Sequence, residues 1–483
     1  MPDPVPAVAA KTVAPPQTVQ PPEDSALTLA RSTGKPVEVE TQRSETRQVW
    51  AKPDGTFTLE QYVRPVRVRK SGGWVPVDTT LRLRPDGAVE TVATAADLTF
   101  SGGGSGPLAR MARGAKSLEL GWQGTLPKPT LNGDTATYPE VMPGVDLQVT
   151  ADVDGFSHIL VVKSRDAAAG LTELAYPLSV TGLSVKTDKA GNLEAVDESG
   201  GTIFIAPTPK MWDSEGIAGL KALREGRSPE ARESAMGVEL AGRQLRLKPD
   251  RKMLADPKTK FPVYLDPYFS ASRGSWTAVW SNWPTSNYLN SSDIARVGHI
   301  SSTQTNRSFF QMATGATIHG KQIIKATLRT YETWSYSCSA RKVEAWGTGA
   351  ISKSTTWKNP PAKTRLLSTV NVAKGYGTGS CAPGGVEFDV TSWAADAAAK
   401  KWNTMTIGLY ATSETDLWAW KKFKNNPVAV IEYNSIPTDP VAADAWSDPG
   451  GPCVSGDGRP VISTATPKLW AKLKDTDNSV KGR

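Results

Sequence analysis

Cysteine and histidine are scarce in this sequence. Its 483 residues include only three cysteines and three histidines: Cys338, Cys381, Cys453, His158, His299 and His319. None of them forms a close pair such as C-x-x-C or H-x-x-x-H, which a zinc site of His and Cys ligands requires. The sequence therefore predicts no metal site of this kind, and we expect no cofactor.

Familiar catalytic motifs are also missing. The chain contains no H-E-x-x-H, G-x-S-x-G or G-x-x-x-x-G-K-[ST] pattern. The glycine-rich "SGGGSG" at residues 101–106 lacks the lysine and the following helix of a phosphate loop, so it predicts a turn. The "DVDG" at residues 152–155 begins like a calcium loop, but the position that needs a bidentate glutamate is Lys163, which favours a hairpin turn. We therefore expect no catalytic residues and a protein that is not an enzyme.

Long apolar runs and clusters of basic residues are absent too. No stretch reaches the about 18 apolar residues that a membrane span needs. The chain has 56 basic and 48 acidic residues, a net charge of +8, but its Lys and Arg residues are scattered. Such an excess suits a polysaccharide or cell-wall polymer as partner, and without a basic run we expect no nucleic-acid partner.

The first half of the chain alternates apolar and polar residues. Runs such as "TFTLEQYVRPVRVR" and "GWVPVDTTLRLR" are separated by "PDG" at residues 53–55 and 85–87, and by "NGD" at residues 132–134. Asp-Gly and Asn-Gly between alternating runs are the strongest short-range hairpin signal. We predict a disordered Pro/Ala-rich leader over residues 1–24 and an N-terminal β-rich structural region over residues 25–267.

Three local features interrupt this β pattern. "DSALTLARSTGKP" predicts a short helix capped by Asp24 or Ser25 and stopped at residues 34–36. Residues 214–236, rich in Glu, Arg and Ala, predict a helical or mobile surface insertion. His158 in "GFSHILVVK" lies one strand step from Phe156 and Leu160, so we interpret it as a half-buried sheet residue rather than a catalytic base.

The second half is rich in tryptophan, with ten of the sixteen between Trp276 and Trp420. About nine short strand-like runs, with one helix at residues 394–401, predict an antiparallel jelly roll or β-sandwich over residues 268–436. A Pro/Asp-rich linker follows over residues 437–452, and residues 453–483 predict the start of a further Ig-like β domain, truncated here. The predicted fold class is therefore all-β, and we expect downstream domains of a longer chain.

Cys338 and Cys381 lie 43 positions apart, each in or beside a predicted strand of the same domain. A nucleophilic cysteine needs a nearby histidine and a cationic setting, which the surrounding sequence does not suggest. A disulfide closing this loop stabilises by about 4 kcal/mol in the chain-entropy model. We favour the disulfide over two free thiols, and both over a nucleophile. A disulfide predicts an oxidising, extracytoplasmic compartment, and Cys453 has no assigned partner.

Aromatic side chains that remain exposed can stack on sugar rings. In "DLWAWKKF" at residues 416–423, strand alternation places Trp418 and Trp420 on one face. Core packing is the commoner role for any single tryptophan. Among the aromatic residues we select Trp334, Tyr336 and Trp418 as candidates for ligand binding.

Two carboxylates offer a competing enzymatic hypothesis. Glu387 and Asp389 in "EFDVTSW" share one strand face, with their Cα atoms about 7 Å apart by strand rise. That spacing is compatible with a glycosidase pair if other geometry cooperates. Because such acids are common on solvated strand faces, we rank hydrolysis below binding.

Several stretches resemble a known family. "GDTATYPEVMPGVDLQVTADVDGFSHILVVKS", "APTPKMWDS" and "FPVYLDP" are similar to the N-terminal region of large secreted bacterial proteins that carry a DNRLRE domain. "WSYSCSARKVEAW", "STTWKNPP", "FDVTSW" and "WAWKKF" resemble the DNRLRE domain itself. The resemblance covers roughly residues 37–436. It implies a β-sandwich similar to carbohydrate-binding modules, often with LamG-like or repeat modules downstream.

These features favour a non-enzymatic extracellular protein whose jelly roll acts as a carbohydrate-binding-like or cell-surface adhesion module. The alternative is a structural scaffold that presents a downstream repeat, toxin or hydrolase domain. The extracellular location rests on the expected disulfide and on the resemblance, because the first residues do not form an intact signal peptide.

Overall fold

The computed structural model describes residues 22–215, 231–271, 275–291, 293–301, 304–376, 379–435 and 441–472. Strands dominate these residues and their strand pairings are antiparallel, which confirms the all-β fold class. The chain divides into two compact units. The small unit comprises Met1–Thr41, Trp50–Phe57 and Pro437–Arg483, and the large unit comprises Gln42–Val49 and Thr58–Ile436.

The small unit contains the predicted N-terminal helix, α1 (Pro22–Thr33). It begins before Asp24 and Ser25, so neither of them is the predicted cap. Glu23 and Asp24 in its first turn and Arg31 in its last complement the helix dipole. Gly34 follows with a φ of +67°, the left-handed conformation that commonly ends a helix. Most of the predicted leader lies outside the described residues.

The rest of the small unit is short strands and turns. A three-stranded sheet has the order β36–β35–β37, and β1 pairs with the end of β2. Trp446 and Trp470 stack on this sheet with ring centroids 6.2 Å apart. The bounds are β1 (Val37–Glu38), η1 (Glu40–Gln42), β2 (Arg47–Ala51), η5 (Ala442–Asp444), β35 (Ala445–Asp448), β36 (Gly451–Pro452), η6 (Gly456–Gly458) and β37 (Lys468–Ala471). The last residue of η1 and the first three residues of β2 belong to the large unit.

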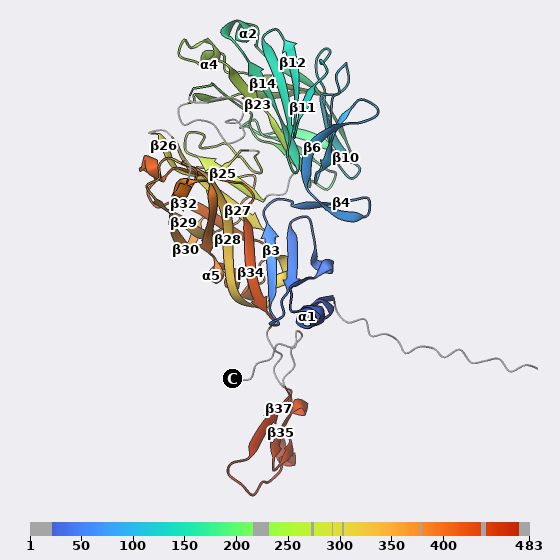
Figure 1. Cartoon of the computed structure of the whole chain (residues 1–483), viewed down its shortest axis with the longest axis vertical. Helices are drawn as coiled ribbons and strands as arrows, with labels where there is room; N and C mark the ends of the chain where they lie inside the picture. Colours follow the sequence, from blue (N-terminus) through green and yellow to red (C-terminus); the bar gives the residue numbers. More distant parts are fainter. Residues whose placement is uncertain are drawn as a thin grey trace, which may run out of the picture. The chain divides into compact units, whose positions relative to one another are not determined.

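In the large unit, residues 78–271 form two packed sheets, here called the first sandwich (Figure 1). The first sheet has the order β21–β22–β15–β10–β9–β8–β7–β6. Its bounds are β6 (Asp78–Leu83), β7 (Val89–Ala93), β8 (Asp97–Phe100), β9 (Ala109–Arg113), β10 (Lys116–Leu120), β15 (Leu174–Thr181), β21 (Gly237–Ala241) and β22 (Gln244–Lys248).

The second sheet has the order β11–β12–β13–β14–β24–β18–β17–β16, with β23 pairing β14 and β19, and β20 pairing β19. Its bounds are β11 (Thr130–Asn132), β12 (Thr135–Met142), β13 (Val145–Ala151), β14 (Gly155–Val162), β16 (Ser184–Thr187), β17 (Leu193–Val196), β18 (Thr202–Ala206), β19 (Lys210–Trp212), β20 (Glu233–Ala235), β23 (Val263–Asp266) and β24 (Tyr268–Ala271). Short elements beside the sandwich are β4 (Arg67–Lys70), β5 (Gly73–Pro76), α2 (Arg165–Ala169) and α4 (Arg251–Ala255).

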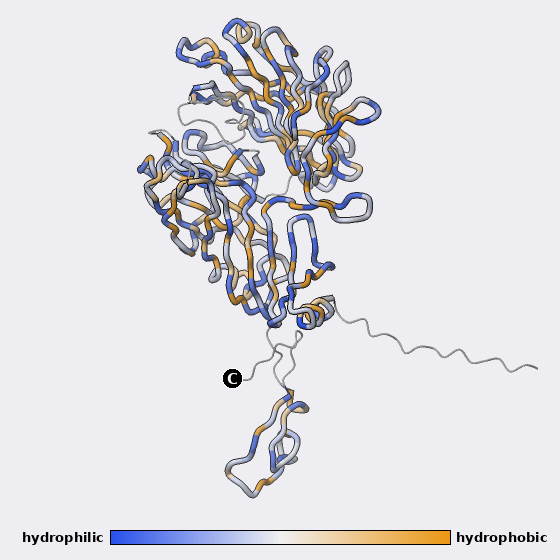
Figure 2. The backbone as a smooth tube through the Cα atoms, viewed as in Figure 1, coloured by the Kyte–Doolittle hydropathy of each residue, from blue (hydrophilic) through white to orange (hydrophobic). Residues whose placement is uncertain are grey.

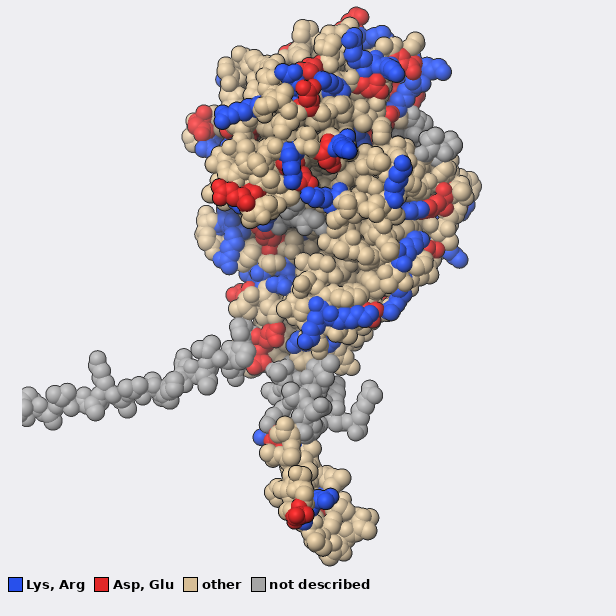
Figure 3. All heavy atoms as spheres, turned by 180° about the vertical axis from the view of Figure 1, so that it is seen from behind, with Lys and Arg blue, Asp and Glu red and all other residues tan. Residues whose placement is uncertain are grey.

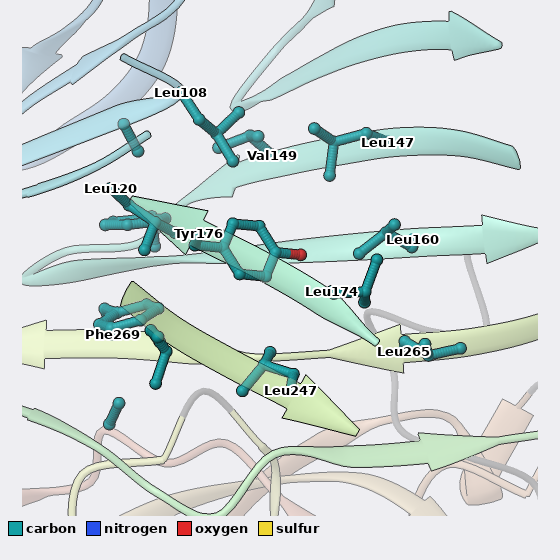
Figure 4. Close-up of a cluster of buried hydrophobic side chains, with 14 of the residues drawn as sticks. Leu108, Leu120, Leu147, Val149, Leu160, Leu174, Tyr176, Leu247, Leu265 and Phe269 are labelled. Atoms are coloured by element: carbon teal, nitrogen blue, oxygen red, sulfur yellow. The ribbon is translucent and has the colours of Figure 1, made fainter. Parts of the chain in front are cut away.

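One apolar core joins these two sheets. Leu120, Tyr176 and Leu247 from the first sheet meet Leu160 and Phe269 from the second (Figure 4). Along β13 and β14 the inward positions alternate with outward ones, as strand geometry requires. Figure 2 shows the same alternation of hydrophobic and hydrophilic residues along many strands.

Residues 275–435, with β3, form the second sandwich, which corresponds to the predicted jelly roll. The strand path is β3–β34–β28–β33–β26–β27–β32–β29–β30, with β25 on β27 and β31 on β28. Strand β26 pairs with both β33 and β27, so it links the two halves of this path. The predicted helix at residues 394–401 is α5, which begins three residues earlier.

The bounds in the second sandwich are β3 (Phe57–Tyr62), β25 (Trp276–Trp280), β26 (Ala295–Ser301), β27 (Gln304–Met312), η2 (Gly315–Ile318), β28 (Gln322–Ser335), β29 (Arg341–Thr348), β30 (Lys363–Val372), η3 (Gly379–Cys381), β31 (Gly384–Asp389), α5 (Thr391–Ala399), β32 (Met405–Ala411), η4 (Leu417–Ala419), β33 (Lys421–Phe423) and β34 (Val428–Asn434). No helix among the described residues is long and apolar enough to cross a membrane.

The predicted hairpins at residues 85–87, 132–134 and 152–155 are confirmed. They join β6 to β7, β11 to β12 and β13 to β14. Gly87 and Gly133 have φ values of +86° and +59°, which explains why these turns use glycine.

Two further local predictions are wrong. His158 is fully buried rather than half-buried, because the alternate residues of β14 face the core. Trp418 and Trp420 do not share a strand face, because the chain makes the 3₁₀ turn η4 before β33 begins. Of the predicted insertion at residues 214–236, residues 216–230 lie outside the described part, and β20 occupies part of its end.

Candidate functional site

The Cys338–Cys381 disulfide is present in the second sandwich, with the two Cα atoms 5.7 Å apart. It joins the segment after β28 to η3. The backbone N–H groups of Gly375 and Tyr376 donate to the Cys381 carbonyl at 2.6 and 3.1 Å. A Cβ on Gly375 would lie 2.2 Å from the Thr333 carbonyl oxygen, so only glycine fits there. The disulfide agrees with an oxidising, extracellular location.

The predicted aromatic residues lie around the end of β28 and on η4. The rings of Trp334 and Tyr336 meet edge to face, with centroids 5.8 Å apart. Trp334 also packs edge-on against Trp420, at 4.6 Å. Trp420 is fully buried, whereas Trp334 and Tyr336 are half-buried and Trp418 is 45% exposed.

A capped turn presents Trp418. The Asp416 carboxylate accepts a hydrogen bond from the Trp418 backbone N–H at 2.9 Å and another from Arg341 Nε at 2.6 Å. The Arg341 guanidinium lies 4.9 Å from the centre of the Trp418 ring. The hydrogen bond from Arg341 lowers the pKa of Asp416. We call Trp334, Tyr336, Trp418 and Arg341 the aromatic patch.

Next to this patch the sandwich encloses a charged pair that the sequence did not reveal. Lys421 Nζ and Glu332 Oε1 are 3.2 Å apart, and both side chains are fully buried. Lys421 Nζ also donates to Ser335 Oγ at 2.9 Å. Burial raises the pKa of Glu332 and lowers that of Lys421, and the charge of each opposes the shift of the other. Lys422, the next residue, flanks the rings of Trp334 and Trp420 at 5.3 and 5.1 Å.

The two acids of the enzymatic hypothesis have other partners. Glu387 and Asp389 are both exposed on β31. Glu387 pairs with Arg329 at 2.9 Å, and Asp389 accepts the Thr391 N–H at 2.9 Å at the start of α5. This backbone hydrogen bond lowers the pKa of Asp389. Their contacts therefore support roles in strand pairing and helix capping.

No cluster of three or more His, Cys, Asp or Glu side chains in the described ranges is arranged to hold a metal ion. Cys453, in the small unit, is exposed and free. On the face seen in Figure 3, basic and acidic side chains are interspersed over the large unit rather than gathered in one basic field.

Comparison with known proteins gives curated relatives but no matching family model. The chain is 24% identical over 408 residues to the tRNA3(Ser)-specific nuclease WapA of Bacillus spizizenii. This alignment covers 78% of this chain and 16% of that protein. The chain is also 25% identical over 400 residues to the tRNA nuclease WapA of Bacillus subtilis strain 168. That alignment covers 76% of this chain and 16% of the relative. The tRNA(Glu)-specific nuclease WapA of Bacillus subtilis subsp. natto matches to the same extent.

These relatives contradict the prediction of a protein that is not an enzyme, because all three are named as tRNA nucleases. The chain spans only 16% of the length of these relatives. The nuclease activity in their names therefore describes the whole, much longer proteins.

Two solved structures show only slight likeness. A β-porphyranase of glycoside hydrolase family 86 from Bacteroides plebeius has a TM-score of 0.17 at 7% identity, over 65% of this chain and 40% of that chain. The ANX2 ectodomain of Arabidopsis thaliana has a TM-score of 0.17 at 8% identity, over 78% of this chain and 97% of that chain. Neither likeness is close enough to inform fold or function.

Proposed function

We propose that this chain is the surface-attaching β region of an exported nuclease protein. In this proposal the second sandwich, as a DNRLRE-like module, binds a polysaccharide-rich surface through the aromatic patch, and the chain thereby holds a tRNA nuclease at that surface. The support comes from the alignment with named tRNA nucleases over about three quarters of the chain, and from the disulfide.

The observation that carries the binding role is the setting of Trp418. Trp418 is 45% exposed although Asp416 and Arg341 fix its turn. A tryptophan whose purpose is core packing has no need of such a support, whereas a flat ring held outward suits stacking on a sugar ring. Trp334 and Tyr336, half-buried and in mutual contact, extend the aromatic surface.

Retention on insoluble glycans tests the binding role. The full chain is mixed with purified bacterial cell walls and with insoluble polysaccharides, and bound protein is measured after washing. We expect Trp418→Ala and Trp334→Ala each to lower the association constant about three- to tenfold, the range of one aromatic stacking contact.

Trp446→Ala, in the small unit, is the matched control, because it also removes a partly exposed tryptophan but lies outside the patch. If neither patch variant changes retention, or if the wild-type chain is retained on no surface, the proposed binding role is wrong.

The nuclease role is tested on the protein as its native host secretes it. Incubation with total tRNA is expected to give discrete cleavage fragments. Intact tRNA after prolonged incubation would contradict the assignment to a nuclease.

A further inference from the structure

A large cleft in the large unit has no assigned role. Its volume is about 930 Å³, which is at the upper end of the range for small-molecule sites. One wall is the outer face of the second sheet of the first sandwich. The facing wall includes Tyr288, Ser291, Ile294 and Asn426 of the second sandwich.

Strand register sets a row of polar side chains along the first wall. Asn132 on β11 is opposite Thr135 on β12, which is opposite Thr150 on β13. Thr150 is opposite Ser157 on β14, which is opposite Tyr268 on β24. Side chains directly opposite one another share a face of the sheet. With neighbouring strands about 4.8 Å apart, the row extends about 19 Å across five strands.

A second row runs beside the first. Thr137 is opposite Gln148, and Gln148 is opposite Ile159. All three line the cleft and are half-buried. The side chains of Thr137 and Gln148 make no hydrogen bond to the described residues, so their hydroxyl and amide groups are available to a ligand.

The charged side chains of the cleft are largely occupied. Lys210 pairs with Glu233 at 3.1 Å and lies over the Trp280 and Tyr288 rings at 3.2 and 3.9 Å. Asp293 pairs with Arg296 at 2.9 Å. In the first row, Thr135 and Thr150 hydrogen-bond to each other at 3.0 Å, and the Tyr268 hydroxyl donates to Asp152 at 3.1 Å. What remains for a ligand is mainly the uncharged polar groups of Ser157, Thr137 and Gln148, with the apolar side chains of Ile159 and Ile294 beside them.

A buried ion network fixes the two walls to each other. Arg64 is 2.7 Å from both Asp152 and Asp154, which belong to the β13–β14 hairpin of the first wall. Arg64 also donates to the Asn425 side chain at 3.2 Å, and its backbone N–H donates to Asn426 at 2.6 Å. A cleft whose walls are joined in this way is preformed, which lowers the entropic cost of binding.

We propose that this cleft binds an extended neutral oligosaccharide, which lies across strands β11 to β24. Hydroxyl and amide side chains at regular strand spacing match a ligand with repeated hydroxyl groups, and the length of the row matches several sugar units rather than one. This site is separate from the aromatic patch and does not depend on it.

Calorimetric titration of the full chain tests the proposal. The probes are neutral gluco-, manno-, xylo- and N-acetylglucosamine oligosaccharides, with polygalacturonate fragments as the anionic comparison. We expect at least one neutral series to bind, with affinity rising with chain length. The double variant Gln148→Leu/Thr137→Val should bind it about tenfold or more weakly, because two ligand hydrogen bonds are lost.

Gln322→Leu is the matched control, since it removes an exposed glutamine on β28, away from the cleft. Trp418→Ala should keep full affinity for the neutral oligosaccharide, which separates this site from the patch. The proposal is overturned if no neutral oligosaccharide binds, if only polygalacturonate binds, or if the double variant binds like the wild type. Unfolding midpoints of the variants establish that they remain folded.

Discussion

At the scale of single residues, His158 is a titratable group in an apolar environment. It lies in the core of the first sandwich, with its ring 5.1 Å from Tyr176 and 6.0 Å from Phe269. Neither ring nitrogen has a hydrogen-bond partner among the described residues. Burial lowers the pKa of His158 from 6.5 to about 3, so the folded protein keeps this imidazole neutral.

The lowered pKa of His158 predicts a loss of protein stability in acid. The unfolded chain binds a proton at His158 below about pH 6.5, whereas the folded chain does not until about pH 3. The stabilisation is therefore present above pH 6.5 and falls as the pH decreases through this window, by about 3 kcal/mol at pH 4. Urea unfolding of wild type and His158→Phe between pH 7 and pH 4 measures it.

Between pH 7 and pH 4 we expect the free energy of unfolding of His158→Phe to fall by about 3 kcal/mol less than that of the wild type, because phenylalanine does not titrate. Parallel pH profiles for the two proteins would show that His158 is not the group responsible. The sequence predicted that this histidine shares a strand face with Phe156 and Leu160. It could not predict that the side chain is fully buried, because that burial depends on Tyr176 from the facing sheet.

At the scale of elements, the predictable turns are those whose own residues determine them. The hairpins at residues 85–87 and 132–134 were found because Gly87 and Gly133 supply the positive φ that these turns need. The turn η4 was missed because "LWAW" has the composition of a strand. Its conformation depends on Asp416, and Arg341, distant in sequence, holds that carboxylate.

The disulfide is the element-scale contact with the clearest energetic consequence. It closes a loop with a sequence separation of 43 residues, so its removal should lower the free energy of unfolding by about 4 kcal/mol in the chain-entropy model. Cys338→Ser/Cys381→Ser and the wild type are compared by urea unfolding under non-reducing conditions.

Cys453→Ser is the control, because this cysteine is exposed and free, and its replacement should change stability by less than about 0.5 kcal/mol. Thiol titration of the unfolded, unreduced wild type should find one free thiol. Three free thiols in protein from the native host, or equal stability of the double variant and the wild type, would remove the support for an oxidising compartment.

At the scale of the whole molecule, the features that sequence patterns could not predict are those assembled from distant segments. The cleft rows draw on five strands, and Arg64 meets residues near positions 152 and 425. Nothing near Arg64 in the sequence marks it as different from Arg67, which is half-buried, and Arg69, which is exposed. By contrast, the strands themselves were predictable, because each carries its own alternation of apolar and polar residues.

The buried ion network of Arg64 is expected to stabilise the large unit. Arg64 is 6% exposed, and Asp154 is 2% exposed. Burial opposes the charge of Arg64, but the two carboxylates outweigh this effect and hold its pKa well above the ordinary value. Arg64→Met keeps the apolar stem but leaves both carboxylates without their cation.

We expect Arg64→Met to lower the free energy of unfolding by about 3–5 kcal/mol, since removing one partner leaves buried charge uncompensated. Arg329→Met is the matched control, because its pair with Glu387 is about half exposed on both sides and should contribute less than about 1 kcal/mol. Urea unfolding followed by tryptophan fluorescence measures both variants. If both variants lose the same small amount of unfolding free energy, the Arg64 network does not hold the walls of the cleft together. The inference that the cleft is preformed would then be wrong.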